Sequence, residues 1–356
     1  MSVFDDFREA LSNDSQLVLM PISRLTIDSP IRVGEILIQP PGTVDFSALR
    51  PIPNAVLPDG SDRSTVSLLQ GQNLREVCTS VTGFDIQVLR EHPIAVFVTK
   101  IDWNAFLKFD HNDDLVLLAK LSEQAEASLD FIRFDFCRFD LNASLPGRVG
   151  SWRDSGACLG ALIYEPRDHE SYLIAGEAGH GIIVARGLGL ELDTQPSAFP
   201  REQGEVGNIA RYGLRLFRTV LEAASETDQF MRVMTLLEYL AHPNSFGKWQ
   251  EVKKEIAAHV ANNKTHYAAL LERFKELTHI TDSNNNERGL RTLVIHHGKY
   301  LDEILPTKHD RQELFLELQG YASKVLYDML SNPKWTWNEL HEFRKRRRLQ
   351  IGVGSS

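Results

Sequence analysis

Short apolar runs, separated by proline, glycine, serine and aspartate, dominate the first half of the chain. Runs that alternate in part between apolar and polar positions, as half-buried strands do, cover residues 16–20, 31–38 and 84–103. A helix is expected after residue 110, where Leu115, Leu118 and Leu121 share one face. Residues 131–139 then alternate strictly and predict a strand, whose aromatic residues we interpret as core packing rather than as an RNA-stacking surface.

Residues 147–189 are rich in glycine and are expected to add further strands. The apolar runs in this region cover residues 157–165, 171–177 and 180–187. We interpret residues 176–181 as a turn, because neither Gly-x-Gly-x-x-Gly nor the Gly-Lys-Ser of a phosphate loop occurs there. His180 in this turn is accordingly expected to be structural.

Beyond residue 204, apolar residues recur every three to four positions, which predicts helices. The predicted helices cover residues 204–224, 226–241, 248–261, 264–278, 310–330 and 335–348. Ser225 is expected to cap the second of these, because an acidic first turn follows it.

This change of pattern divides the chain into two domains. Residues 193–200 contain two prolines and are interpreted as the linker between them. We assign residues 1–192 to a β-rich (mixed α/β) N-terminal domain, residues 201–350 to an all-α helical bundle, and residues 351–356 to a flexible tail. The predicted fold class is therefore α+β.

Residues 287–299 stand out within the helical half. Apolar residues recur through and beyond this stretch at helical spacing, at Leu290, Leu293, Val294, Leu301 and Ile304. They predict one helix, which Pro306 ends. At 100° per residue, one strip about a quarter-turn wide holds Arg288, Thr292, His296 and Lys299. Arg291 lies to one side of this strip and His297 to the other.

These polar side chains suit the cleavage of RNA by its own 2′-hydroxyl. Arginine is a fixed cation whose planar donor group fits phosphate, and histidine gives and takes a proton near neutral pH. The reaction needs one group that moves a proton and another that stabilises charge on the phosphate, and it needs no metal. The structural alternative is that His296 or His297 is a hydrogen-bonded histidine at a packing edge and that the arginines are solvated.

Composition adds limits on partners and compartment. The net charge of −9 argues against a general polyanion binder, so any contact with nucleic acid must come from a local patch. Cys78, Cys137 and Cys158 are far apart and predict buried thiols in a reducing compartment, with no metal site. No apolar run approaches the ~20 residues of a membrane-spanning helix, and the acidic N-terminus is not a secretory signal. We therefore expect a cytoplasmic protein that has no membrane partner.

Arg291, four intervening residues and His296, near the start of a late helix in a helical domain, resemble the motif of the HEPN superfamily. Within it, LRTLVIHHGKYLDEI looks like the ApeA-type branch, in which an arginine, a short apolar run and a His-Gly pair precede a lysine-rich or acidic helix. RVMTLLEYLAHP, which contains Glu238, is similar to the Glu-containing helix of that branch, and KWTWNELHEFRKRRR to its last helix. The resemblance covers residues 202–348. Two histidines rather than one precede Gly298, and Thr292 replaces a more polar residue.

The resemblance implies a metal-independent endoribonuclease without a cofactor, which acts on RNA in antiviral defence or in a toxin-like role. It implies that Arg291 and either His296 or His297 are catalytic, with the proton-transfer role open between the two histidines. The groups it implies in supporting or substrate-binding roles are Arg288, Thr292, Lys299 and Glu238. Glu238 would pair with Arg288 or Arg291 and orient it. The resemblance also implies a homodimer in which two such helices meet across a two-fold axis, and an N-terminal domain that senses a trigger molecule or protein.

Two other hypotheses stay open at this point. The helical half would instead be a catalytically silent HEPN module that binds RNA or a protein partner, or only a scaffold in a nucleotide-transferring system. The basic run at residues 344–348 has two readings of equal weight. It either complements the C-terminus of its helix, or contacts a phosphate backbone near residues 287–299.

Overall fold

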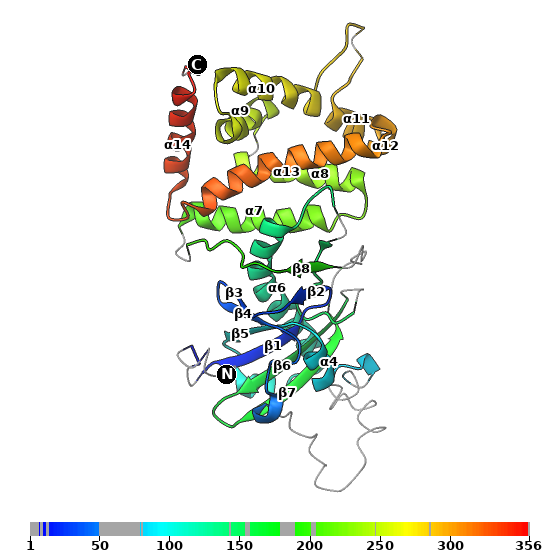
Figure 1. Ribbon diagram of the computed structural model, residues 1–356, viewed down its shortest axis with the longest axis vertical. Helices are drawn as coiled ribbons and strands as arrows, with labels where there is room; N and C mark the ends of the chain where they lie inside the picture. The colour runs from blue at the N-terminus through cyan, green and yellow to red at the C-terminus, as the bar shows by residue number, and fades with distance from the viewer. Residues whose placement is uncertain are drawn as a thin grey trace. The chain divides into compact units, whose positions relative to one another are not determined.

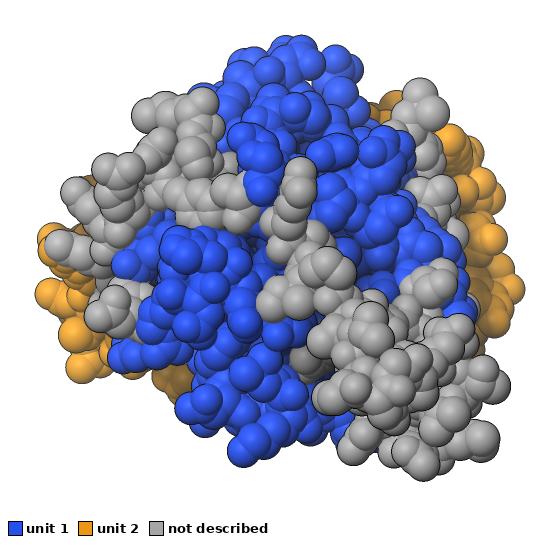
Figure 2. Space-filling model, turned by 90° about the horizontal axis from the view of Figure 1, so that it is seen from below, with its two compact units in different colours: residues 1–133, 143–196 blue, residues 134–142, 197–356 orange. Residues whose placement is uncertain are grey.

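The computed structural model forms two compact units, which Figure 2 distinguishes. Unit 1 comprises residues 1–133 and 143–196, and unit 2 comprises residues 134–142 and 197–356. The residues that the structure describes are 7, 10–11, 14–49, 79, 81–141, 144–153, 157–178, 189–200, 204–245, 247–284 and 286–354. The predicted strand at 180–187, with His180, lies outside them. Among the described helices, none combines the length and the apolar character needed to cross a membrane.

Unit 1 is built on a six-stranded antiparallel sheet with the strand order β3-β4-β5-β1-β6-β7 (Figure 1). Its strands are β1 (Gln16–Pro21), β3 (Ile31–Val33), β4 (Ile36–Gln39), β5 (Ile94–Thr99), β6 (Cys158–Glu165) and β7 (Glu170–Glu177). A separate parallel pair joins β2 (Leu25–Ile27) to β8 (Leu190–Leu192). The strands predicted from the described apolar runs at 16–20, 157–165 and 171–177 are confirmed, and so is the α+β fold class. The run at 31–38 forms two antiparallel strands, β3 and β4, rather than one, because the chain turns at Gly34, whose φ is 57°.

The predicted strand pair over residues 84–103 is correct only in its second half, which is β5. The first half is helix α4 (Ile86–Glu91), and Asp85 caps it by accepting a hydrogen bond from the backbone of Val88. The first backbone N–H groups of a helix have no partner within the helix, and a capping aspartate accepts a hydrogen bond from one of them. Asp85 therefore favours a helix over a strand at this point. Two further short helices lie in the described connections of unit 1, the 3-10 helix η1 (Phe46–Ala48) and helix α5 (Trp103–Phe106).

The predicted strand over residues 131–139 is wrong, because residues 131–136 end helix α6 (His111–Phe136). Buried residues follow a helical period through this segment, at Leu118, Leu121, Ala125, Leu129 and Ile132. The buried guanidinium of Arg133 pairs with Asp130 at 2.9 Å and with Glu126 at 2.5 Å, both on preceding turns of the same helix. This buried face outweighs the local alternation of aromatic and polar residues.

The centre of the sheet is buried on both faces, since every residue of β1 and β6 is buried. On one face, Leu17 and Leu19 belong to a core cluster that includes Phe84. On the other face, α6 packs closely against the sheet, because a Cβ atom added to Gly176 would lie 2.5 Å from the Leu115 side chain. Burial on both faces explains why these strands are nearly continuous apolar runs rather than strict alternations.

Unit 2 is a helical bundle. Its helices are α7 (Glu205–Leu221), α8 (Glu226–Ala241), α9 (Trp249–Val260), α10 (Lys264–Thr278), α11 (Leu290–His297), α12 (Leu301–Ile304), α13 (Lys308–Leu330) and α14 (Trp337–Gln350). Helix α13 packs against α7, α8 and α9, and α9 also contacts α10 and α14 (Figure 1). The predicted cap is confirmed, because the Ser225 side chain accepts a hydrogen bond from the backbone of Asp228 at the start of α8.

Residues 134–142 belong to unit 2, although the sequence pattern assigns them to the N-terminal domain. The ring of Phe139 lies 4.5 Å from that of Phe217 in α7. Gln319 of α13 donates a hydrogen bond to the carbonyl of Cys137 at 2.9 Å and accepts one from the backbone of Phe139 at 2.7 Å. Phe139 is therefore core packing, and it packs in the helical core rather than in the sheet.

Candidate functional site

The stretch at residues 287–299 is not one continuous helix, and that prediction is wrong. Helix α11 ends at His297, and Gly298 follows it with a φ of 66° in the left-handed region. The backbone of Lys299 then donates a hydrogen bond to the carbonyl of Leu293. This is the usual glycine-terminated helix end, in which a residue without Cβ reverses the chain at little steric cost. Lys299 therefore lies outside the polar strip predicted for a straight helix.

The start of α11 is held against the end of α10. A Cβ atom added to Gly289 would lie 2.4 Å from the backbone carbonyl oxygen of Thr278, so a larger residue does not fit at this contact. Three residues later, the hydroxyl of Thr292 donates a hydrogen bond to the same carbonyl at 2.9 Å. Thr292 is thus used to position the helix, and its side chain is half-buried.

Arg288 precedes α11 and also lies outside the predicted strip. Its guanidinium pairs with Asp282 at 3.0 Å in the loop before the helix. Hydrogen bonds from Asn286, with smaller contributions from Asn284 and Arg288, lower the pKa of Asp282 to about 2. The loop therefore keeps a charged carboxylate at neutral pH, and Arg288 is directed to it rather than to Glu238.

Arg291 connects three helices. Its guanidinium lies 3.4 Å from a carboxylate oxygen of Glu238 in α8, which confirms the pairing expected for that carboxylate. It also lies over the ring of Trp249, the first residue of α9, at 5.7 Å from the ring centroid. Both charged side chains are about 30 % exposed, at 29 % for Arg291 and 30 % for Glu238. The guanidinium is thus held in place on one side and reaches solvent on the other.

The other end of α11 carries an exposed group of side chains. The side chains of His296, His297 and Lys299 are exposed and make no hydrogen bond or ion pair with any residue that the structure describes. Two large apolar side chains beside them are also exposed, Ile295 at 37 % and Tyr300 at 63 %. This surface therefore offers two imidazoles and an ammonium group next to apolar side chains that have no buried position in the chain.

One copy of α11 does not direct its arginine and its histidines to the same place. Arg291 and His296 are five residues apart, which is about 140° around a helix, and His297 is about 120° away on the other side. A single chain therefore presents a proton-transfer group and a phosphate-binding group on different faces of one short helix.

Sequence reasoning missed a buried network around His259 of α9. His259 is fully buried, with Nδ1 2.8 Å from a carboxylate oxygen of Asp328 and Nε2 accepting a hydrogen bond from Arg344 at 2.9 Å. Burial lowers the pKa of His259 to about 4, so the imidazole is neutral at physiological pH. The signal was absent from the sequence, because these residues lie on three helices.

The basic run at residues 344–348 lies in the second half of α14, and its first residue belongs to this network. Arg344 is buried and donates further hydrogen bonds to the carbonyls of Leu240 and Ala241 at the end of α8. In Figure 1, α14 lies on one side of the helical unit and α11 with α12 on the opposite side. Arg347 and Arg348 lie in the last turn of α14, so the reading of the run as a complement to the C-terminus of its own helix is confirmed. Contact of the run with a phosphate backbone stays a prediction.

Among the described residues, no group of three or more His, Cys, Asp or Glu side chains is placed to hold a metal ion. Comparison of the chain with protein-family profiles, with curated proteins and with solved structures finds no match.

Proposed function

We propose that this chain is a metal-independent endoribonuclease of the HEPN type, active in the cytoplasm as a homodimer, with a composite site formed by α11 of two subunits. The observation that carries the proposal is the combination on α11 of a pre-positioned arginine and two adjacent, solvent-exposed histidines. The exposed side chains of Ile295 and Tyr300 beside the histidines support a contact with a second copy, since apolar side chains gain most when they are buried at an interface.

Each group has a role that its surroundings support. The ion pair with Glu238 and the ring of Trp249 hold the Arg291 guanidinium, so that its remaining N–H donors would stabilise the phosphorane-like transition state. His296 or His297 would take the proton from the 2′-hydroxyl or give one to the leaving 5′-oxygen. The exposed ammonium group of Lys299 would bind a neighbouring phosphate of the RNA. Glu238 and Thr292 are positioning residues in this proposal, and Arg288 binds Asp282.

The proposal is tested by incubating the full chain with cellular RNA in excess EDTA. Wild type is compared with Arg291→Ala and with the double variant His296→Ala/His297→Ala. Both variants are expected to lose cleavage by a factor of about 100 or more, because each lacks one of the two chemical functions. The single histidine variants then assign the proton-transfer role.

His309→Ala is the matched control, because His309 is an exposed histidine of α13 whose ring lies 3.2 Å from Glu313. It is expected to cleave RNA like wild type. Cleavage that persists in Arg291→Ala and in the double variant would remove the proposed site. Wild type that binds RNA but never cleaves it would favour the alternative function, a catalytically silent HEPN module.

A further inference from the structure

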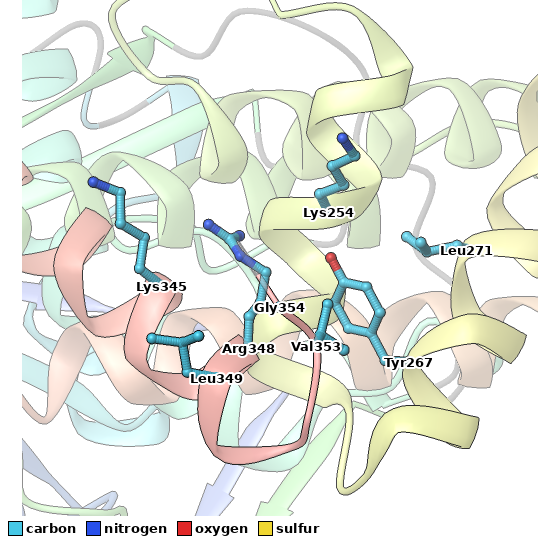
Figure 3. Close-up of a pocket in the computed structure, with 8 residues that line it drawn as sticks. All are labelled: Lys254, Tyr267, Leu271, Lys345, Arg348, Leu349, Val353 and Gly354. Atoms are coloured by element: carbon cyan, nitrogen blue, oxygen red, sulfur yellow. The ribbon is translucent and has the colours of Figure 1, made fainter. Parts of the chain in front are cut away.

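A pocket of about 490 Å³ lies in unit 2 between α9, α10 and α14, on residues that the proposed nuclease site does not use. Figure 3 shows the side chains that line it. They are Lys254, Tyr267, Leu271, Lys345, Arg348, Leu349, Val353 and Gly354. The volume falls within the range of roughly 300–1,000 Å³ that is typical of sites for small organic ligands.

Three cations from two helices border this pocket: Lys254, Lys345 and Arg348. Lys254 is exposed and makes no ion pair within the described part of the chain, so its ammonium group is available to a ligand. Arg348 is held by Glu255 at 3.1 Å and is 19 % exposed, which fixes its guanidinium at the pocket. A fixed guanidinium loses little conformational entropy when it binds an anion.

Positive charge exceeds negative charge around the pocket. Glu255 is shared between Arg348 and the buried Arg344, which lies 3.6 Å from it, and Lys345 pairs with Glu342 at 2.6 Å. Among the lining residues and their ion-pair partners there are thus three cations, Lys254, Lys345 and Arg348, and two carboxylates, Glu255 and Glu342. This excess is local, since the whole chain carries a net charge of −9.

The rest of the pocket is apolar and aromatic. In Figure 3 the charged ends of Lys254 and Arg348 and the hydroxyl of Tyr267 point to the upper side of the pocket, and Leu349 and Val353 lie below them. Tyr267 is 5 % exposed, and burial raises the pKa of its hydroxyl, which therefore stays a neutral hydrogen-bond donor. A neutral phenol can donate to a phosphate oxygen, whereas its ring and the leucines contact an apolar group.

We propose that this pocket binds a nucleotide, with two or more phosphate charges at Lys254, Lys345 and Arg348 and the base against Tyr267, Leu271 and Leu349. The cationic side accounts for the phosphates, and the apolar side accounts for a flat organic group. The site is independent of the proposed nuclease site, because α14 and α11 lie on opposite sides of the helical unit (Figure 1).

The proposal is tested by titrating the full chain with ADP, ATP, inorganic pyrophosphate and adenosine in a calorimeter. ADP and ATP are expected to bind. Pyrophosphate, which lacks the base, is expected to bind at least about tenfold more weakly, and adenosine, which lacks the phosphates, is expected not to bind. Pyrophosphate that binds as tightly as ADP would overturn the assignment of the base, and a chain that binds an RNA oligonucleotide but no mononucleotide would overturn the proposal.

Two variants locate the site without touching the buried network. Lys254→Ala and Leu349→Glu change exposed side chains that line the pocket, and each is expected to weaken ADP binding by about tenfold or more. Arg346→Ala is the matched control, since Arg346 is an exposed cation of α14 that does not line the pocket. ADP binding that is unchanged in both pocket variants, or lost equally in Arg346→Ala, would contradict the proposed site.

Discussion

At the scale of single residues, the buried imidazole of His259 in α9 links α13 to the last helix, α14. The neutral imidazole donates one hydrogen bond to Asp328 and accepts another from Arg344, so that both buried ring nitrogens are satisfied. Arg344 in turn donates to the carbonyls of Leu240 and Ala241. A protonated imidazole has no acceptor for Arg344 and would place two cations side by side in the core.

The network predicts acid sensitivity. The folded pKa of His259, about 4, lies below its ordinary value of 6.5, so the unfolded chain binds a proton in this interval that the folded chain does not. The contribution to stability is fully present above pH 6.5 and is lost as the pH falls towards 4. The loss is of order 3 kcal/mol at most. Urea unfolding of wild type and of His259→Gln at several pH values measures it.

The His259→Gln variant is expected to lose less stability between pH 6.5 and pH 4 than wild type does, because glutamine keeps a donor and an acceptor but does not titrate. Parallel pH profiles for the two chains would contradict this account of the network.

The sequence predicted a contact correctly where a charged residue interrupts an apolar stretch. Glu238 lies in an apolar helical stretch, so a partner was expected, and Arg291 is that partner. Arg288 was an equal candidate, but Asp282 in the preceding loop binds it. The sequence contained no comparable conflict at His259, whose partners come from α13 and α14.

At the scale of elements, two glycines determine the length and place of α11. Gly289 allows the backbone of α11 to approach the end of α10, and Gly298 ends the helix in the left-handed region. The apolar residues keep their helical spacing from α11 into α12, so the sequence predicted one helix where there are two. Helical spacing alone does not reveal a turn that a glycine makes between two helices. His297 therefore ends its helix at the surface.

The close contact at Gly289 gives a prediction with a matched control. Gly289→Ala is expected to destabilise the fold by roughly 1–3 kcal/mol, since its Cβ atom meets backbone atoms that cannot move aside. Gly320→Ala, on the exposed face of α13 with nothing within 4 Å of its Cβ position, is expected to stabilise it by roughly 0.5–1 kcal/mol. Thermal or urea unfolding measures the change in the free energy of unfolding for both variants. Changes of equal size and the same sign would contradict this explanation.

The error over residues 131–139 has a physical reason at the same scale. A short alternation of aromatic and polar residues favours a strand. It does not do so when the segment is part of a longer stretch whose buried residues follow a helical period. Here the buried face of α6 runs through Ile132, and Arg133 completes its charge pairs within the helix. The correct period was visible only over the whole of α6.

At the scale of the whole molecule, the coarse architecture could be predicted because the two halves of the chain follow different hydrophobic periods. The α+β class and most described strands and helices follow from these periods. The sheet order, in which β1 pairs with β5 and β6, could not be predicted, because every central strand is an apolar run that fits several positions. The pocket between α9, α10 and α14 could not be predicted either, because it depends on how these three helices pack.

The proposed function requires self-association through α11. Ile295→Glu is expected to shift the chain from dimer towards monomer in analytical ultracentrifugation, with a dissociation constant raised by about tenfold or more, since it places a charge in an apolar contact. Val116→Glu in α6, where valine is 70 % exposed, is the control and is expected to leave the dimer unchanged. A monomeric wild type, or a dimer that tolerates Ile295→Glu, would exclude the composite site.

The chemistry of the RNA ends tests the central claim most directly. Wild-type chain in EDTA is given an RNA oligonucleotide and a matched oligonucleotide with 2′-O-methyl groups at the cleaved positions. Cleavage by an internal 2′-hydroxyl predicts products with 2′,3′-cyclic phosphate and 5′-hydroxyl ends from the first, and no cleavage of the second. Products with 3′-hydroxyl and 5′-phosphate ends, or equal cleavage of both oligonucleotides, would contradict the account.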